Sequence, residues 1–74
     1  SRIYRWYARL KEIELQLEEK QTEEDLRDMD ARLDNIENAV NHIPTPLAFS
    51  ANLYSFRQHI DLVRARLRRR MRTG

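Results

Sequence analysis

The clearest structural signal in the chain is the segment LRDMDARLDNIENAV, residues 26–40. Its apolar side chains recur at alternating three- and four-residue intervals, the spacing of one face of an α-helix. They are Leu26, Met29, Leu33, Ile36 and Val40, and Ile43 continues the series. Charged and polar residues occupy most of the positions between them. The pattern therefore predicts an amphipathic helix and not a strand, whose side chains would alternate with a period of two.

The same spacing occurs on both sides of this segment. The N-terminal seam consists of Ile3, Trp6, Leu10, Ile13 and Leu17, and the C-terminal seam of Leu53, Phe56, Ile60, Val63 and Leu67. Short connections make consecutive helices antiparallel neighbours. The sequence therefore predicts an all-α, up-down-up three-helix bundle with coiled-coil-like packing, in one domain covering residues 1–74. The expected helices span residues 3–20, 22–42 and 46–72.

Local signals mark the two breaks between the expected helices. Thr22 is a good N-cap, and Asp25 follows three residues later, next to two glutamates that suit the positive end of a helix. At the second break, Thr45 is placed to cap a helix that begins at Pro46. Ser50 is a competing cap for the same helix.

Aligning the three seams outward from each turn gives about five layers of three side chains. Leu10, Leu33 and Ile60 share the middle layer, and Trp6 and Phe56 share a neighbouring one. A core of this size supplies only marginal stability, so self-association is expected. Four large apolar residues lie off the seams, where they would either widen the core or form a second apolar face for a partner. They are Tyr4, Leu15, Tyr54 and Leu62.

Composition excludes several classes of protein. The 74 residues include one glycine, two prolines and no cysteine, which leaves too few turns for a β-sandwich and no disulfide framework. No stretch approaches the roughly 18 consecutive apolar residues of a membrane span. Fourteen Lys and Arg against twelve Asp and Glu give a net charge of +2, too balanced for a protein that binds nucleic acid over its whole surface.

Catalytic motifs are lacking in the sequence. It has no glycine-rich phosphate loop and no nucleophile with a base at useful spacing, and the predicted bundle is too slim to enclose a pocket. Residues 60–64 look superficially like small helical chorismate mutases, but the likeness ends there. The two histidines, His42 and His59, are expected too far apart to share a metal. We therefore expect neither catalysis nor a cofactor or metal site.

The C-terminal arginine run consists of Arg64, Arg66, Arg68, Arg69, Arg70 and Arg72. Arginine clusters bind phosphates through charge and paired N–H donors, which favours nucleic acid or anionic lipid as a ligand. The predicted bundle offers a structural role instead, since the end of the third helix lies beside the acidic first turn. The acidic residues there are Glu18, Glu19, Glu23, Glu24, Asp25 and Asp28. The structural role is the favoured interpretation, and phosphate binding is the alternative.

The first residues of the chain combine aromatic and basic side chains. They are Arg2, Tyr4, Arg5, Trp6, Tyr7 and Arg9. Such a mixture suits the cytoplasmic side of a membrane–water interface, where amphipathic rings lie at headgroup depth and basic residues follow a span. The simpler interpretation is that Trp6 belongs to the core and the tyrosines shield it. The two interpretations are compatible.

Two stretches of the chain resemble a known family. SRIYRWY at residues 1–7, continued by LKEIE at residues 10–14, resembles the segment after the C-terminal transmembrane helix in TAXI-family solute-binding subunits of TRAP transporters. PLAFSANLY at residues 46–54 and RQHIDLVR at residues 57–64 are similar to the closing motif of that family. Phe49 and Ser50 stand where the family pattern has tyrosine and alanine.

The resemblance implies a cytoplasmic C-terminal segment of a bacterial inner-membrane transport protein, located after a transmembrane helix. The ligand-binding lobes of this family lie upstream and outside the membrane, so we expect no small-molecule substrate in this segment. The expected role is a non-catalytic, membrane-proximal anchor or protein-interaction module. Its expected partners are transporter membrane subunits or a second copy of itself, with anionic lipid headgroups as a further contact.

Overall fold

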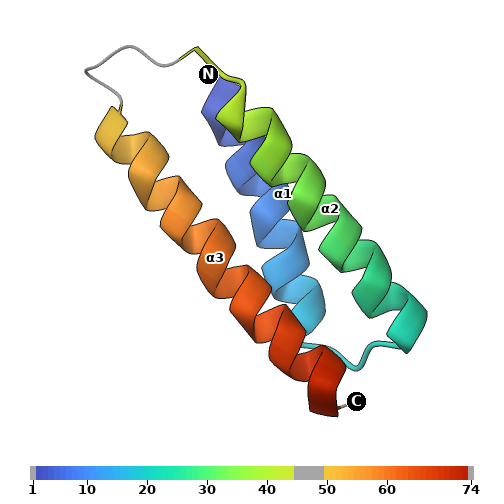
Figure 1. Cartoon of the computed structure of the whole chain (residues 1–74). Coiled ribbons are helices and arrows are strands. Elements are labelled where there is room, and N and C mark those ends of the chain that lie inside the picture. The colour runs from blue at the N-terminus through green and yellow to red at the C-terminus, as the bar shows by residue number, and fades with distance from the viewer. Residues whose placement is uncertain (1, 45–49, 74) are drawn as a thin grey trace.

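The structure is a computed structural model that describes residues 2–44 and 50–73. Within these ranges the chain forms three helices: α1 (Arg2–Leu17), α2 (Glu23–Asn41) and α3 (Ser50–Thr73). Each helix packs against the other two. Figure 1 shows α1 running from the N-terminus to the opposite end of the molecule, α2 returning and α3 running parallel to α1. The predicted all-α, up-down-up bundle is confirmed.

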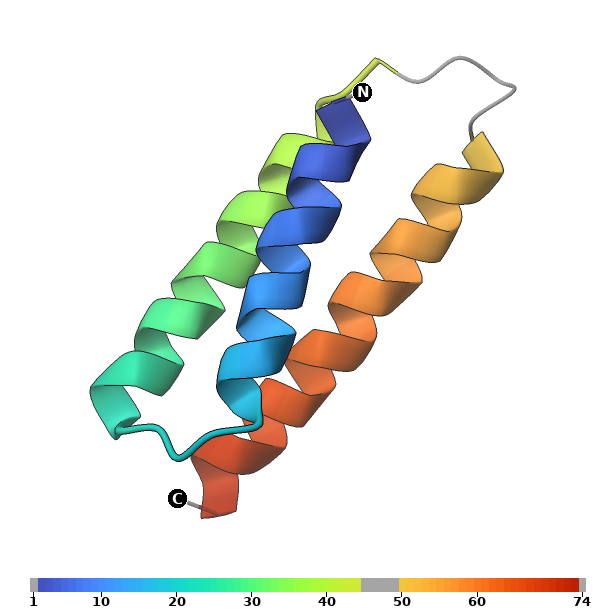
Figure 2. The same ribbon diagram turned by 180° about the vertical axis from the view of Figure 1, so that it is seen from behind.

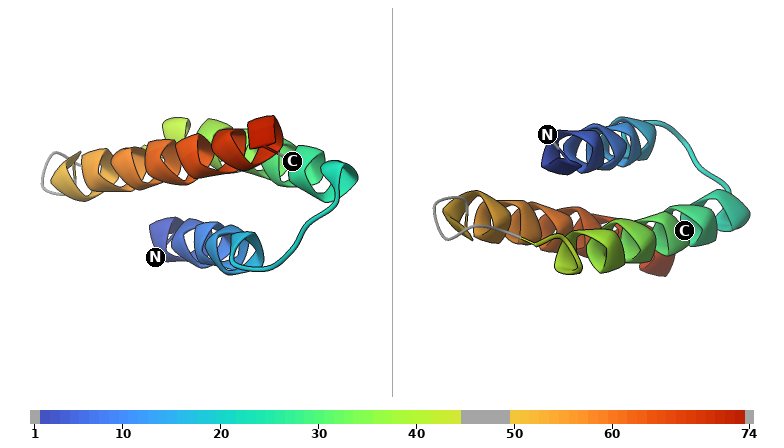
Figure 3. Two further views of the ribbon diagram at one scale, coloured as in Figure 1. Left: turned by 90° about the horizontal axis from the view of Figure 1, so that it is seen from below. Right: turned by 90° about the horizontal axis from the view of Figure 1, so that it is seen from above.

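The helices are arranged as a pair covered by a third. Seen from below and from above, α2 and α3 lie in one layer and α1 lies in a second layer on one side of the pair (Figure 3). From behind, α1 lies in front of the space between α2 and α3 (Figure 2). The described part of the molecule measures 41 × 17 × 16 Å. All three helices therefore contribute to one elongated core.

The predicted seams form this core. Twelve seam residues are buried: Leu10, Ile13, Leu17, Leu26, Met29, Leu33, Ile36, Val40, Phe56, Ile60, Val63 and Leu67. The remaining four, Ile3, Trp6, Ile43 and Leu53, are partly buried and pack against the cluster. No polar or charged side chain is buried among the residues that the structure describes. The core is therefore held by apolar packing, whose contribution scales with the area removed from water.

Tyr7 and Met71 also pack against the core, although they lie outside the predicted seams. Tyr7 follows Ile3 by four residues and precedes Leu10 by three, so it shares their side of α1. Its ring lies against Phe56, with centroids 4.1 Å apart and an interplanar angle of 36°. This contact agrees with the seam alignment, which places Phe56 level with the start of α1. The helical spacing of Tyr7 was the signal that the seam prediction overlooked.

The four off-seam residues do not widen the core. Tyr4, Leu15, Tyr54 and Leu62 have 71%, 50%, 63% and 68% of their surface exposed, respectively. Each lies on a helix whose opposite side faces the core. The prediction that they widen the core is therefore wrong, and the alternative, a second apolar face for a partner, stays a prediction.

Helix α1 ends at Leu17, three residues before the predicted end at Lys20. The backbone N–H groups of Glu18 and Glu19 donate to carbonyls only three residues back, at Leu15 and Gln16, which tightens the last turn. Leu17 is also the last side chain of α1 that reaches the core. Because the next residues bury no apolar side chain in the core, the helix ends there.

Helix α2 begins with the predicted cap. The Thr22 hydroxyl oxygen accepts a hydrogen bond from the Asp25 backbone N–H at 3.0 Å, and the Thr22 N–H donates to the Asp25 carboxylate at 3.2 Å. This reciprocal arrangement is a capping box, which satisfies two N–H groups that a helix start otherwise leaves unpaired. At the other end, the His42 ring Nδ1 lies 2.6 Å from the Asn38 carbonyl oxygen.

Helix α3 begins at Ser50 in the part of the chain that the structure describes. The predicted start at Pro46 and its cap Thr45 lie outside the described residues. At the other end, α3 extends to Thr73, one residue past the predicted end. The Thr73 hydroxyl donates back to the Arg69 carbonyl oxygen at 3.1 Å.

Candidate functional site

The arginine run lies on the last three turns of α3, but its members point in different directions because 3.6 residues make a turn. Arg64 and Arg68 face α2, and Arg70 faces the end of α1. Each of these three has a partner within the bundle. Arg66, Arg69 and Arg72 are the other three members of the run.

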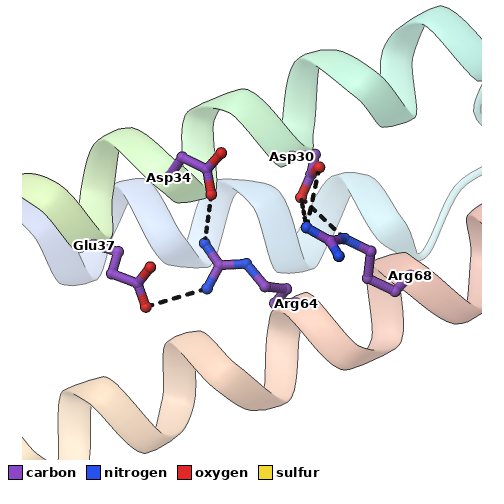
Figure 4. Close-up of polar contacts among 5 residues, drawn as sticks. All are labelled: Asp30, Asp34, Glu37, Arg64 and Arg68. Atoms are coloured by element: carbon purple, nitrogen blue, oxygen red, sulfur yellow. Dashed lines mark hydrogen bonds and ion pairs between the residues drawn. The ribbon is translucent and has the colours of Figure 1, made fainter.

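Arg64 and Arg68 pair with carboxylates in the middle of α2 (Figure 4). Arg64 Nη2 lies 2.9 Å from Asp34 Oδ1, and Arg64 Nη1 lies 3.2 Å from Glu37 Oε2. Arg68 Nη2 lies 3.1 Å from Asp30 Oδ1, and its Nε lies 3.3 Å from the same oxygen. The Arg64 side chain is only 17% exposed, so its stem also covers apolar surface between the helices.

One register of α2 against α3 satisfies both arginines. Arg68 follows Arg64 by one helical turn, and Asp30 precedes Asp34 by one turn, which matches two helices running in opposite directions. An axial shift of either helix would break both pairs together. The pairs therefore report the alignment of α2 and α3 as well as stabilising it.

Arg70 binds the end of α1. Its guanidinium donates to the Leu17 carbonyl oxygen and, at 3.0 Å, to the Glu19 carbonyl oxygen. The last carbonyls of a helix have no partner within the helix, and a cation near them also offsets the negative end of the helix dipole. Gln21 adds a third contact, since its side-chain N–H donates to the Gln16 carbonyl oxygen at 2.7 Å.

These partners differ from those that the sequence favoured. The prediction paired the arginine run with the carboxylates around the first turn. In the described residues, Arg64 and Arg68 instead contact carboxylates further along α2, and Arg70 contacts backbone carbonyls near the turn. The difference arises because arginine side chains lean toward the N-terminus of their helix, which carries the Arg64 and Arg68 guanidinium groups away from the turn.

Arg66, Arg69 and Arg72 form the remainder of the run. Arg69 and Arg72 are exposed and Arg66 is half-buried. Among the interactions of the described residues, no ion pair or side-chain hydrogen bond involves these three guanidinium groups. They are the basic groups of the run that a ligand or partner would meet without displacing an internal contact.

The aromatic and basic residues at the start of α1 are divided between core and surface. Tyr7 and Trp6 are half-buried against the core, whereas Tyr4 is 71% exposed. The Arg5 guanidinium carbon lies 5.5 Å from the centroid of the Trp6 ring, within reach of a cation–π contact. Arg9 is exposed, and the side chain of Arg2 lies outside the described ones. The exposed members are Tyr4, Arg5 and Arg9.

Charge is distributed unevenly along the bundle. Residues 1–11 and 38–60 contain no aspartate or glutamate, so all twelve acidic residues occur at residues 12–37 and 61. The described parts of the acid-free stretches lie at the end of the bundle where α1 begins, α2 ends and α3 begins (Figure 1). Asp34 and Glu37 of α2 follow one to two helical turns further into the bundle. The acid-free stretches carry Arg5, Arg9, Lys11 and Arg57, so this end is basic, and the exposed aromatic residue Tyr4 belongs to it.

Two of the surface hollows are lined entirely by described residues. The smaller, of about 90 Å³, lies between α1 and α2 and is lined by Trp6, Arg9, Glu12, Ile13, Arg32, Asn35 and Ile36. The Arg32 guanidinium there is engaged by Gln16 at 2.6 Å and Asp28 at 3.1 Å. The larger, of about 390 Å³, is open and lies between α1 and α3, where Tyr7, Ala8, Leu10, Lys11, Glu14 and His59 line it.

Two negative findings apply to residues 2–44 and 50–73 only. No group of three or more His, Asp or Glu side chains is arranged to hold a metal ion. No helix combines the length and apolar character needed to cross a bilayer.

Comparison of the chain with models of known protein families, with curated proteins and with solved structures gives no match.

Proposed function

We propose that this chain is the C-terminal cytoplasmic domain of a TAXI-family TRAP transporter subunit, acting as a non-catalytic, membrane-proximal anchor or interaction module. The proposal starts from the resemblance of residues 1–14 and 46–64 to that family. One structural observation supports it most: the described parts of these two stretches, residues 2–14 and 50–64, form the starts of α1 and α3 and lie at the same end of the bundle (Figure 1).

The chemistry of that end suits a membrane surface on the cytoplasmic side. It is the acid-free end of the bundle, so no carboxylate at this end would be repelled by anionic headgroups. Exposed Tyr4 and Arg5 are the residue types that occupy headgroup depth next to a span. The acidic α1–α2 turn lies at the opposite end of α1 and would point into the cytoplasm.

In this proposal the domain does not touch the transported solute. Its partners are the membrane subunits of the transporter or a second copy of the domain, with anionic lipid headgroups as a further contact. The part played by the fold is to present the basic, aromatic end toward the membrane on a small rigid bundle.

The test uses the gene that encodes the chain. The coding sequence upstream of Ser1 is expected to contain a span of roughly 20 apolar residues within a few codons. A fluorescent protein fused after Gly74 should fluoresce in the membrane fraction of bacterial cells, and an alkaline phosphatase at the same position should be inactive. An upstream sequence without such a span, or an active phosphatase fusion, would contradict the proposal.

A second candidate function is binding of nucleic acid or anionic lipid by the arginine run. The observation that favours it is a set of three guanidinium groups, on Arg66, Arg69 and Arg72, that have no partner among the described residues. Titration with duplex DNA or anionic vesicles at two salt concentrations tests it, because phosphate binding weakens steeply with salt. Binding that is absent at low salt would eliminate this candidate.

A further inference from the structure

Two surface stripes lie beside the larger hollow between α1 and α3. The stripe on α1 consists of the exposed residues Tyr4, Ala8, Lys11 and Leu15, and Glu18 continues it in the turn directly after the helix. The stripe on α3 consists of His59, Leu62 and Arg69, which are exposed, and Arg66, which is half-buried. Successive members are three or four residues apart, so each set lies on one side of its helix. Ala8, Lys11 and His59 line the hollow itself, which places both stripes on the same side of the molecule. We call this surface the α1–α3 face.

Large apolar side chains on this face are exposed to water, which is unfavourable for apolar groups. Leu62 is 68% exposed and Leu15 is 50% exposed. By contrast, none of the polar side chains that the structure describes is buried. Exposed apolar groups that gather on one face mark interaction sites, whereas apolar residues scattered singly over a surface do not. The hollow is also lined by the apolar side chains of Tyr7 and Leu10. A partner on this face would remove these groups from water.

The contacts within the bundle establish which residues of the two stripes lie level. Tyr7 stacks on Phe56 near one end, and Arg70 binds the Leu17 carbonyl near the other. Since α1 and α3 run parallel, Leu15 lies level with residues 62–66, and Glu18 lies level with Arg69. Apolar positions on one stripe therefore match the apolar position on the other to within one helical turn.

The stripes carry opposite charges at the same level. On the α1 side, Glu14 pairs with Lys11 at 3.6 Å, and Glu18 in the turn after α1 has no ion pair among the described residues. On the α3 side the same level carries Arg66 and Arg69. The guanidinium groups of these two arginines have no ion pair among the described residues. The α1 stripe is thus complementary to the α3 stripe in charge as well as in apolar positions.

We propose that the α1–α3 face binds a second copy of this chain, with the two bundles parallel and related by a two-fold axis along their length. In this arrangement α1 of each copy packs against α3 of the other, because an isologous interface pairs each patch with its counterpart. Leu15 meets Leu62 of the second copy, and Glu18 meets Arg69. Both acid-free ends then lie at the same end of the dimer.

Charge selects the parallel arrangement over the antiparallel one. If the second copy were reversed, its Arg66 and Arg69 would lie over the first turns of α1, which carry basic residues and no carboxylate before Glu12. Like charges placed together across an interface disfavour that arrangement. The dimer is expected to be weak, because each copy contributes few apolar groups to it.

Sedimentation equilibrium of the 74-residue chain tests the association directly. The chain should dimerise reversibly at concentrations up to about 1 mM, and Leu15→Glu or Leu62→Glu should weaken the dimer at least about tenfold by burying a charge in the interface. The matched control is Ala31→Glu on α2, an exposed position off the α1–α3 face, which should leave the dissociation constant unchanged. Helicity by circular dichroism should be unchanged in all three variants. A monomer at every concentration, or a dimer indifferent to both leucine variants, would overturn the proposal.

A charge exchange tests the pairing. Glu18→Arg and Arg69→Glu should each weaken the dimer, and the double variant should recover most of the lost affinity, because the exchanged pair is again complementary. A double variant as weak as the sum of the two single variants would show that Glu18 and Arg69 do not meet.

A distance between the two copies tests their relative orientation in the dimer. The chain has no cysteine, so a single spin label at Glu24→Cys, on the exposed start of α2, reports one position per copy. A parallel dimer places both labels at the same end, closer together than the 41 Å length of the bundle. A separation exceeding that length would indicate the antiparallel arrangement and overturn the parallel one.

Discussion

Arg64 on α3 reaches across to Asp34 on α2, with Arg64 Nη2 2.9 Å from Asp34 Oδ1. The same guanidinium contacts Glu37 through its other terminal nitrogen at 3.2 Å (Figure 4). Only 17% of the Arg64 side chain is exposed, whereas 68% of the Asp34 side chain is exposed. The pair is therefore asymmetric: the cation is largely inserted between two helices and the carboxylates lie at the rim.

This asymmetry predicts the effect of removing the arginine. Arg64→Ala should lower the free energy of unfolding by about 1–2 kcal/mol, since it removes two ion pairs and the packing of the arginine stem, while the exposed carboxylates regain water. Arg69→Ala, which removes an exposed guanidinium without an ion pair in the described residues, should change stability by less than about 0.5 kcal/mol. Urea denaturation at low protein concentration measures both. Equal effects of the two substitutions would contradict the Arg64 contacts.

Arg70 should stabilise the end of α1 in particular. Arg70→Ala removes the donors to the Leu17 and Glu19 carbonyls and should increase amide hydrogen exchange in the last turn of α1 more than elsewhere. Arg70→Lys should restore little, because one ammonium group does not reproduce a planar fork that spans two carbonyls. Arg72→Ala is the control, and the same exchange pattern in that variant would count against the specific role of Arg70.

The capping box should carry a measurable part of the stability of α2. Thr22→Ala should lower the free energy of unfolding by about 1 kcal/mol, because the Asp25 N–H loses its acceptor at the helix start. Thr73→Ala removes a hydroxyl that bonds only within its own helix end, and its effect should stay below about 0.5 kcal/mol. Thermal denaturation followed by circular dichroism compares the two. A destabilisation by Thr73→Ala that matches Thr22→Ala would contradict the cap.

Leu33 should be among the most sensitive positions of the core. It is fully buried, and Leu33→Ala should cost about 2–5 kcal/mol through lost burial and the cavity left behind. In a domain this small, such a loss is comparable to the whole stability, so the variant should be partly unfolded at room temperature. Leu15→Ala at a half-exposed position provides the comparison. A melting curve unaffected by Leu33→Ala would show that the layer assignment is wrong.

Most of the fold could be predicted from local patterns in the sequence. The seam residues were recognisable because burial on one side of a helix requires apolar side chains every three or four positions, and this requirement leaves its trace in consecutive residues. The start of α2 was recognisable for the same reason, since Thr22 and Asp25 are three residues apart. Tyr7 carried that signal too, as it lies four residues after Ile3.

Contacts between residues that are distant in the sequence could not be predicted as well from the sequence. Arg64, Arg68 and Arg70 look alike in the sequence, yet the structure gives them carboxylates of α2 or carbonyls of α1 as partners, and gives Arg66 none among the described residues. Which partner an arginine meets depends on its direction around the helix and on the axial alignment of neighbouring helices. Neither quantity is written in the spacing of the arginines themselves.

The sequence by itself determined the number of helices, their antiparallel order and the side of each helix that is buried, because all three follow from periodicity and from short connections. The tertiary structure alone decided where α1 ends, which arginines have partners within the bundle, and that Tyr7, Lys11 and His59 line one open hollow. The physical reason is that these features depend on the relative positions of helices. Those positions result from packing all three helices around one core, and the sequence of a single segment does not determine them.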